Sequence, residues 1–162
     1  MNHLTSLENY TASQKIVGLR FIYLGVGLFV LGGIAYFISL DETLTDGIVV
    51  SSIVGGLLIL VGGIGYFNFS KKTHQTQAAL YQKDRQAFVK VEQARMAQVV
   101  KDYPKYQVFF ATFIVVGLVV VLLVPSTFWK GAAIPIIILF GVVMVIEMVS
   151  HKAILIHYEN VS

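Results

Sequence analysis

The chain has 162 residues, of which 56% are hydrophobic and 13% are charged, and its formal net charge at pH 7 is +3. The hydrophobic share is far above that of an ordinary soluble domain, which excludes that class and indicates a membrane protein. The absence of cysteine excludes disulfides, thiolate metal sites and thiol catalysis.

Residues 1–20 are polar and precede a full-length apolar run. A removable signal peptide would need a basic start, a short apolar core and a small-residue cleavage site, so we interpret the apolar run as a retained anchor. Two capping patterns, which begin at Thr5 and Thr11, predict a short helix in the membrane interface. Three residues of that helix are expected to face lipid: Leu4, Leu7 and Tyr10.

Residues 21–69 predict a first transmembrane hairpin. Its two apolar runs, Phe21–Leu40 and Gly47–Phe67, contain no charged residue, and each is close to the roughly 20 residues that a span requires. Small residues recur every seven positions along the first run and share one face of the second. Because small residues let helices approach closely in lipid, this spacing predicts a helix-packing seam between the runs. The seam residues are Gly18, Gly25, Gly32, Ser39, Ser52, Gly56 and Gly63.

A glycine face of this kind also suits a contact between subunits or a narrow conduit, and both alternatives stay open at the level of sequence.

Residues 70–105 form a basic connector with eight Lys or Arg and three acidic residues, a net charge of +5. Glycine and proline are absent between Lys71 and Tyr103, which favours helix, and Pro104 is expected to end that helix. A straight helix of this length does not return to a neighbouring span. The connector therefore either breaks near Gln82–Arg85 and returns as a hairpin, or lies along the membrane.

Basic residues beside a span can bind anionic lipid headgroups. The candidates for this contact are Lys71, Lys72, Lys83, Arg85, Lys90 and Arg95. The alternative is a solvated connector whose charge only sets topology. Nucleic acid is not an expected partner, because bases alternate with acids and no reader motif occurs.

Residues 106–150 predict a second transmembrane hairpin, and residues 151–162 form a short tail. Glu147 is the one ionisable residue inside an expected span, and His151 follows on the same helical face, where the two could pair. Together with Asn68 they are a possible ion or proton site, and a structural interfacial pair is the alternative. No metal or cofactor is expected, because a metal would need further ligands.

Lys and Arg tend to stay on the cytoplasmic side of a membrane, so both termini and the connector are expected there. Shifting the sequence by 84 positions places Gly47 on Gly131 and Gly33 on Gly117. This match suggests a tandem repeat about an axis along the membrane normal, although two hydrophobic hairpins can also align by composition.

The expected architecture is thus all-α: four transmembrane helices as two hairpins, with a cytoplasmic helical connector. Nucleotide-binding and hydrolase motifs are absent, so an enzyme is not expected. We expect a membrane scaffold or accessory subunit that self-associates or binds another membrane protein. The alternative is a homo-oligomeric ion channel or small transporter. A channel requires the sparse polar residues to converge on one axis, whereas a scaffold allows them to scatter.

Overall fold

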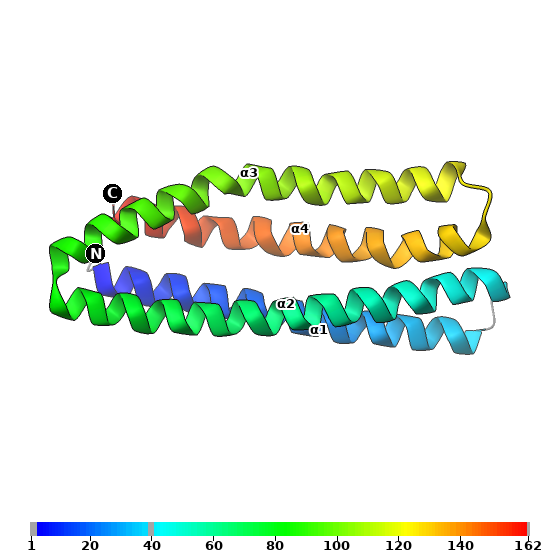
Figure 1. Cartoon of the computed structure of the whole chain (residues 1–162), viewed down its shortest axis with the longest axis horizontal. Coiled ribbons are helices and arrows are strands. Elements are labelled where there is room, and N and C mark those ends of the chain that lie inside the picture. Colours follow the sequence, from blue (N-terminus) through cyan, green and yellow to red (C-terminus); the bar gives the residue numbers. More distant parts are fainter. Residues whose placement is uncertain (1–2, 39–40, 162) are drawn as a thin grey trace.

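The computed structural model describes residues 3–38 and 41–161, and these residues are almost entirely helical (Figure 1). The four helices, in chain order, are α1 (His3–Ile38), α2 (Glu42–Lys83), α3 (Arg85–Leu123) and α4 (Thr127–Val161). Each contains a window that is long and apolar enough to cross a membrane. The predicted all-α class is therefore confirmed, and four candidate spans indicate a multi-pass membrane protein.

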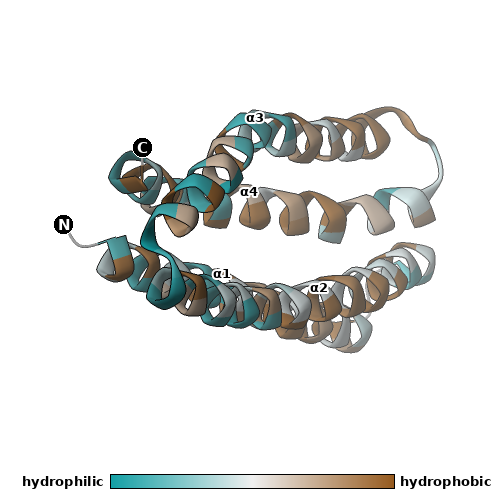
Figure 2. Ribbon diagram, turned by 60° about the vertical axis from the view of Figure 1, so that its left-hand side comes forward, coloured by the Kyte–Doolittle hydropathy of each residue, from teal (hydrophilic) through white to brown (hydrophobic). Residues whose placement is uncertain are grey.

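The helices are longer than a bilayer requires. α2 has 42 residues and is about 63 Å long, roughly twice the 30 Å thickness of a hydrocarbon core. The surplus is polar and gathers at the end of the bundle that holds both termini and the α2–α3 turn (Figure 2). We call this the polar end; it comprises residues 3–20, 70–105 and 150–161.

Asp84 makes the turn between α2 and α3. Its backbone is extended, its N–H donates to the carbonyl of Leu80 at 2.8 Å, and its carboxylate accepts from the backbone N–H groups of Gln86 and Ala87. One residue therefore ends α2 and caps α3. Of the two alternatives for the connector, the break near Gln82–Arg85 is the one found here, and the chain returns along the bundle (Figure 1).

Pro104 does not end a helix, contrary to the prediction. It lies inside α3, which continues to Leu123. Proline within a helix removes one backbone hydrogen bond and favours a bend, and α3 changes direction between its polar and apolar parts (Figure 1).

The predicted interfacial helix at the amino terminus is also wrong. These residues are the first turns of α1, and Leu7 and Tyr10 are buried within the bundle. Because the other helices also extend past their apolar parts, they offer a protein surface on which these side chains bury. Thr11 donates its hydroxyl to the carbonyl of Leu7 within the helix and does not begin one.

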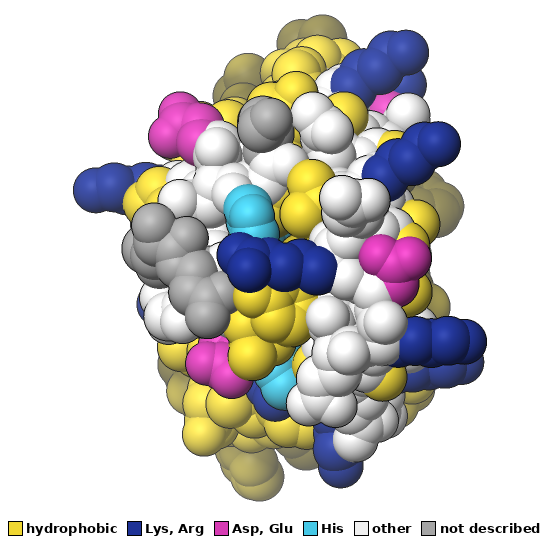
Figure 3. Space-filling view, turned by 90° about the vertical axis from the view of Figure 1, so that its left-hand side faces the viewer, with side chains coloured by type: hydrophobic (Ala, Val, Ile, Leu, Met, Phe, Trp, Pro, Cys, Tyr) yellow, Lys and Arg dark blue, Asp and Glu magenta, His cyan; other side chains and the backbone are white. Residues whose placement is uncertain are grey.

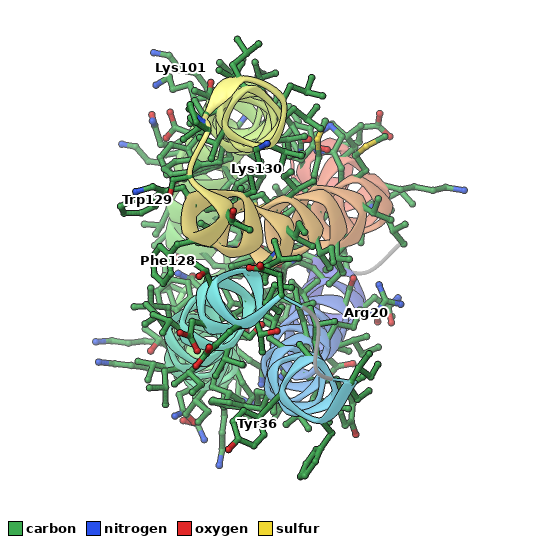
Figure 4. All side chains as sticks on the ribbon, turned by 90° about the vertical axis from the view of Figure 1, so that its right-hand side faces the viewer. Arg20, Tyr36, Lys101, Phe128, Trp129 and Lys130 are labelled. Carbon is green, nitrogen blue, oxygen red and sulfur yellow. The ribbon has the colours of Figure 1, made fainter. Side chains whose placement is uncertain are left out.

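At the opposite end α4 lies between α3 and α2, with α1 beyond α2 (Figures 1 and 4). α1 and α2 are in backbone contact through glycine. A Cβ atom added to Gly25 would lie 2.6 Å from Leu60 Cγ and 2.9 Å from the carbonyl oxygen of Gly56. Gly18 meets α2 at Phe67 and Gly32 meets it at Ser52 in the same way, whereas Ser39 falls outside the described residues.

α2 and α4 also touch through glycine, and this contact is reciprocal. A Cβ on Gly47 would overlap the carbonyl oxygen of Phe128, and a Cβ on Gly131 would overlap the carbonyl oxygen of Leu44. Two backbones can approach this closely only where neither helix carries a side chain.

Gly25→Ala should lower the free energy of unfolding by about 2 kcal/mol, because the added methyl group overpacks the α1–α2 contact. Gly27→Ala is the matched control two residues away, where an added Cβ meets nothing within 4 Å. Denaturant unfolding in detergent measures both variants. Equal tolerance of the two substitutions would contradict the close α1–α2 contact.

Candidate functional site

A chain of buried polar side chains joins three helices at the polar end. Ser6 of α1, Glu92 of α3 and His157 of α4 are 2%, 0% and 1% exposed. Ser6 Oγ lies 2.8 Å from His157 Nδ1, and His157 Nε2 lies 2.8 Å from Glu92 Oε1. A neutral imidazole satisfies both bonds when Nε2–H donates to the carboxylate and Nδ1 accepts from the hydroxyl.

Arg95 completes this group through a bidentate ion pair. Its Nε donates to Glu92 Oε2 at 2.9 Å and its Nη2 donates to Glu92 Oε1 at 2.5 Å. The guanidinium lies 5.2 Å from the centre of the Tyr10 ring, and that ring also stacks on His157 at 4.8 Å. We call Ser6, Tyr10, Glu92, Arg95 and His157 the polar-end network.

Helical spacing and apolar neighbours position the network. Glu92 and Arg95 are one turn apart on α3, as Ser6 and Tyr10 are on α1, so each pair shares a helical face. The buried side chains of Met96, Ile154 and Val161 pack against Tyr10 and keep water out. The ion pair is therefore largely sheltered from solvent.

Burial and pairing act in opposite directions on the charges of the network. Burial raises the pKa of Glu92, but hydrogen bonds from Arg95 and His157 outweigh it and hold that pKa below its usual value. Burial likewise lowers the pKa of Arg95, and the bonds to Glu92 reverse this and raise it. Both groups are therefore charged at neutral pH.

The hydroxyl, imidazole and carboxylate have the connectivity of a hydrolase triad but not its geometry. In such triads Nε2 faces the nucleophile and Nδ1–H faces the acid, whereas here Nδ1 faces Ser6 and Nε2 faces Glu92. Ser6 is also buried, so its hydroxyl does not reach a substrate. The arrangement suits a structural connection between helices better than acyl transfer.

A small pocket of about 30 Å³ lies beside the network between α1, α2 and α3. Its lining residues are Tyr10, Thr11, Gln14, Tyr66, Phe69, Ser70, Thr73 and Arg95. The hydroxyl of Tyr66 donates to Gln14 Oε1, and Gln14 Nε2 is buried without a partner.

No side-chain hydrogen bond or ion pair joins Glu147, His151 and Asn68. Glu147 and His151 form no ion pair; the ring of His151 instead stacks on Tyr103 of α3 at 3.6 Å, so the expected pairing is wrong. Asn68 is exposed on α2. Burial lowers the pKa of His151; burial, followed by the charge of Glu147, raises that of Tyr103. In the described ranges no three His, Asp or Glu side chains gather as metal ligands.

The basic residues assigned to lipid contact lie in different settings. Arg95 is paired with Glu92, while Lys83 and Arg85 flank the α2–α3 turn. Lys71, Lys72 and Lys90 are exposed, and Lys and Arg side chains project around the margin of the polar end (Figure 3).

Sequence reasoning missed Ser6, Glu92 and His157. The residues that meet are 65 and 151 positions apart, so no local spacing connects them. The Glu92–Arg95 spacing was a usable signal, because an acid and a base one turn apart can pair. It does not reveal that the pair is buried.

Comparisons with protein-family models, curated proteins and solved structures find no match to this chain.

Glu92→Gln should lower the free energy of unfolding by about 3 kcal/mol, because it leaves the sheltered guanidinium of Arg95 without its anion. Asp102→Asn is the control, since it removes the acid of the solvent-exposed Asp102–Lys105 pair on the same helix. Denaturant unfolding should leave this control close to the wild type. Similar losses in the two variants would contradict a special role for the buried pair.

Acid should destabilise the protein through Glu92. Because its folded pKa is depressed, Glu92 contributes stability above the ordinary value of 4.5, and this stability is lost as pH falls below 4.5 and through the folded pKa. The unfolding temperature, measured from neutral pH to about 3, should therefore fall less steeply below 4.5 in Glu92→Gln. Parallel profiles would show that other carboxylates carry the effect.

Proposed function

We propose that the protein spans the membrane four times as two hairpins, with both termini and the α2–α3 turn in the cytoplasm. The net +5 charge of residues 70–105 supports this orientation. At the opposite end Tyr36 and Trp129 lie at the periphery of the bundle, as suits aromatic side chains at a lipid–water boundary (Figure 4). The polar end then extends into the cytoplasm as a four-helix bundle.

In this placement the basic residues lie at different distances from the membrane surface. Lys71 and Lys72 follow the apolar run of α2 within about two turns, which suits contact with lipid headgroups. Lys83 lies sixteen residues beyond Phe67, about 24 Å along the helix, so it and Arg85 face the cytoplasm.

Within this membrane we propose a non-catalytic role as a scaffold or accessory subunit. The observation that carries it is the scatter of polar side chains in the apolar parts of the helices. Ser52 is buried against Gly32 in the α1–α2 contact, and Ser51 donates to the carbonyl of Gly47 within α2. Thr112 is exposed on α3 and donates to Val108. Each of these hydroxyl groups is thus held in its own local setting, which supports a scaffold more than a pore.

The glycine seam is occupied inside one chain. Gly18, Gly25 and Gly32 face α2 at distances that leave no room for a side chain, so the seam does not require a second subunit. The reciprocal contact of Gly47 and Gly131 further supports a tandem repeat, because the shift of 84 positions exchanges these residues and also their partners, Leu44 and Phe128.

The proposed interaction surface is the outer face of α3. Only 6% of the most apolar window of α3 is buried within the chain, against 28% for each of the other helices. Val115, Val119 and Leu122 are exposed on one side of this helix. A second copy of the chain would bury a face that the first copy leaves open, and we propose such self-association.

Tryptophan substitutions test the surface, because fluid lipid accommodates a larger side chain and a packed protein interface does not. Wild-type protein in nanodiscs should give a discrete multimer by native mass spectrometry, and Val115→Trp/Val119→Trp should shift it to monomer. Val26→Trp/Val30→Trp places the same bulk on exposed positions of α1 and should leave the multimer intact. A monomeric wild type, or equal behaviour of the two double variants, would reject self-association through α3.

A further inference from the structure

The pocket beside the polar-end network is lined by a buried hydrogen-bond donor that has no acceptor. Gln14 is 4% exposed; its Oε1 accepts from Tyr66, while its Nε2 has no hydrogen-bond partner. A buried amide N–H without a partner costs free energy, and an acceptor held in the pocket recovers it. Ser70 and Thr73 also line this pocket, and a serine or threonine hydroxyl group can donate a hydrogen bond.

The pocket offers an anion N–H donors, while the charge of Arg95 is already offset by Glu92. Among the described residues that line it, Arg95 alone is charged. Glu92 holds the guanidinium of Arg95 in place through Nε and Nη2 and directs its own oxygens to Arg95 and His157. Glu147 is not a lining residue.

The size of the pocket restricts the anion further. A volume of about 30 Å³ holds one compact particle, since a single water molecule needs roughly 10–15 Å³ on this scale. A phosphate ester or a carboxylic acid is larger. We propose that this pocket binds one small inorganic anion of the size of chloride, held by the Arg95 guanidinium and the Gln14 amide.

Chloride itself is the probe for this site. Purified protein in a neutral detergent is titrated with sodium chloride, with sodium gluconate keeping the ionic strength constant, and its thermal unfolding is followed. A ligand that binds only the folded state raises the unfolding temperature in a saturable way. Chloride and bromide should do so, and gluconate is too large to enter. Radioactive chloride retained by the protein provides a second, direct readout.

Three near-isosteric variants distinguish the pocket from a general salt effect. Gln14→Glu keeps an oxygen for the Tyr66 hydroxyl but replaces the N–H donors with a negative charge, and should weaken chloride binding by roughly tenfold or more. Gln77→Glu makes the same change at a buried glutamine of α2 that does not line this pocket, and should keep the response. Thr73→Val removes one lining hydroxyl and should weaken binding without adding charge.

Three results would overturn the proposal. The first is a wild type that responds equally to chloride and gluconate and retains no radioactive chloride, which would leave the pocket to water. The second is an unchanged chloride response in both Gln14→Glu and Thr73→Val. The third is stabilisation of the wild type by phosphatidylglycerol but not by chloride, which would assign the anion to a lipid headgroup.

Discussion

The polar end depends on the buried carboxylate of Glu92. Its two oxygens accept from Arg95 on its own helix and from His157 on α4, and His157 extends the connection to Ser6 on α1. A buried carboxylate is costly unless such partners are present, so it favours the placement of these three helices that brings the partners to it. A purely apolar core would tolerate small slips between the helices. The network therefore sets the register in which the helices continue towards their apolar parts.

In those apolar parts a different interaction holds the helices together. Their contacts are backbone approaches at Gly25 and at the Gly47–Gly131 pair, the kind of contact that holds helices together where lipid provides no hydrophobic force between them. Such contacts tolerate no sliding, because a neighbouring side chain would overlap a carbonyl group. The same four helices run through both regions. Their relative positions are therefore constrained by side-chain hydrogen bonds at the polar end and by backbone contacts in the apolar parts.

Local patterns in the sequence predicted a large part of this fold. Apolar run length predicted the four candidate spans. The glycine- and proline-free connector, too long to return unbroken, left a break near Gln82–Arg85 as one of two alternatives, and Asp84 makes that break. Pro104 was misread because proline disfavours helix but does not forbid it where flanking turns are held by tertiary packing. Ser6, Glu92 and His157 could not be found by spacing, since their meeting depends on how far all four helices extend beyond the apolar runs.

The pocket lies at the boundary between the polar-end network and the glycine-packed apolar parts of the helices. Gln14 belongs to the part of α1 just before its glycine contacts begin, Ser70 and Thr73 to the part of α2 just after its apolar run, and Arg95 to the network. In this short stretch the helices are joined neither by close glycine packing nor by a polar core in which every group is hydrogen-bonded. The amide nitrogen of Gln14 is left without a partner. A ligand held there would contact three helices at once. It would stabilise the contact between these helices at the level where the buried polar network gives way to glycine packing.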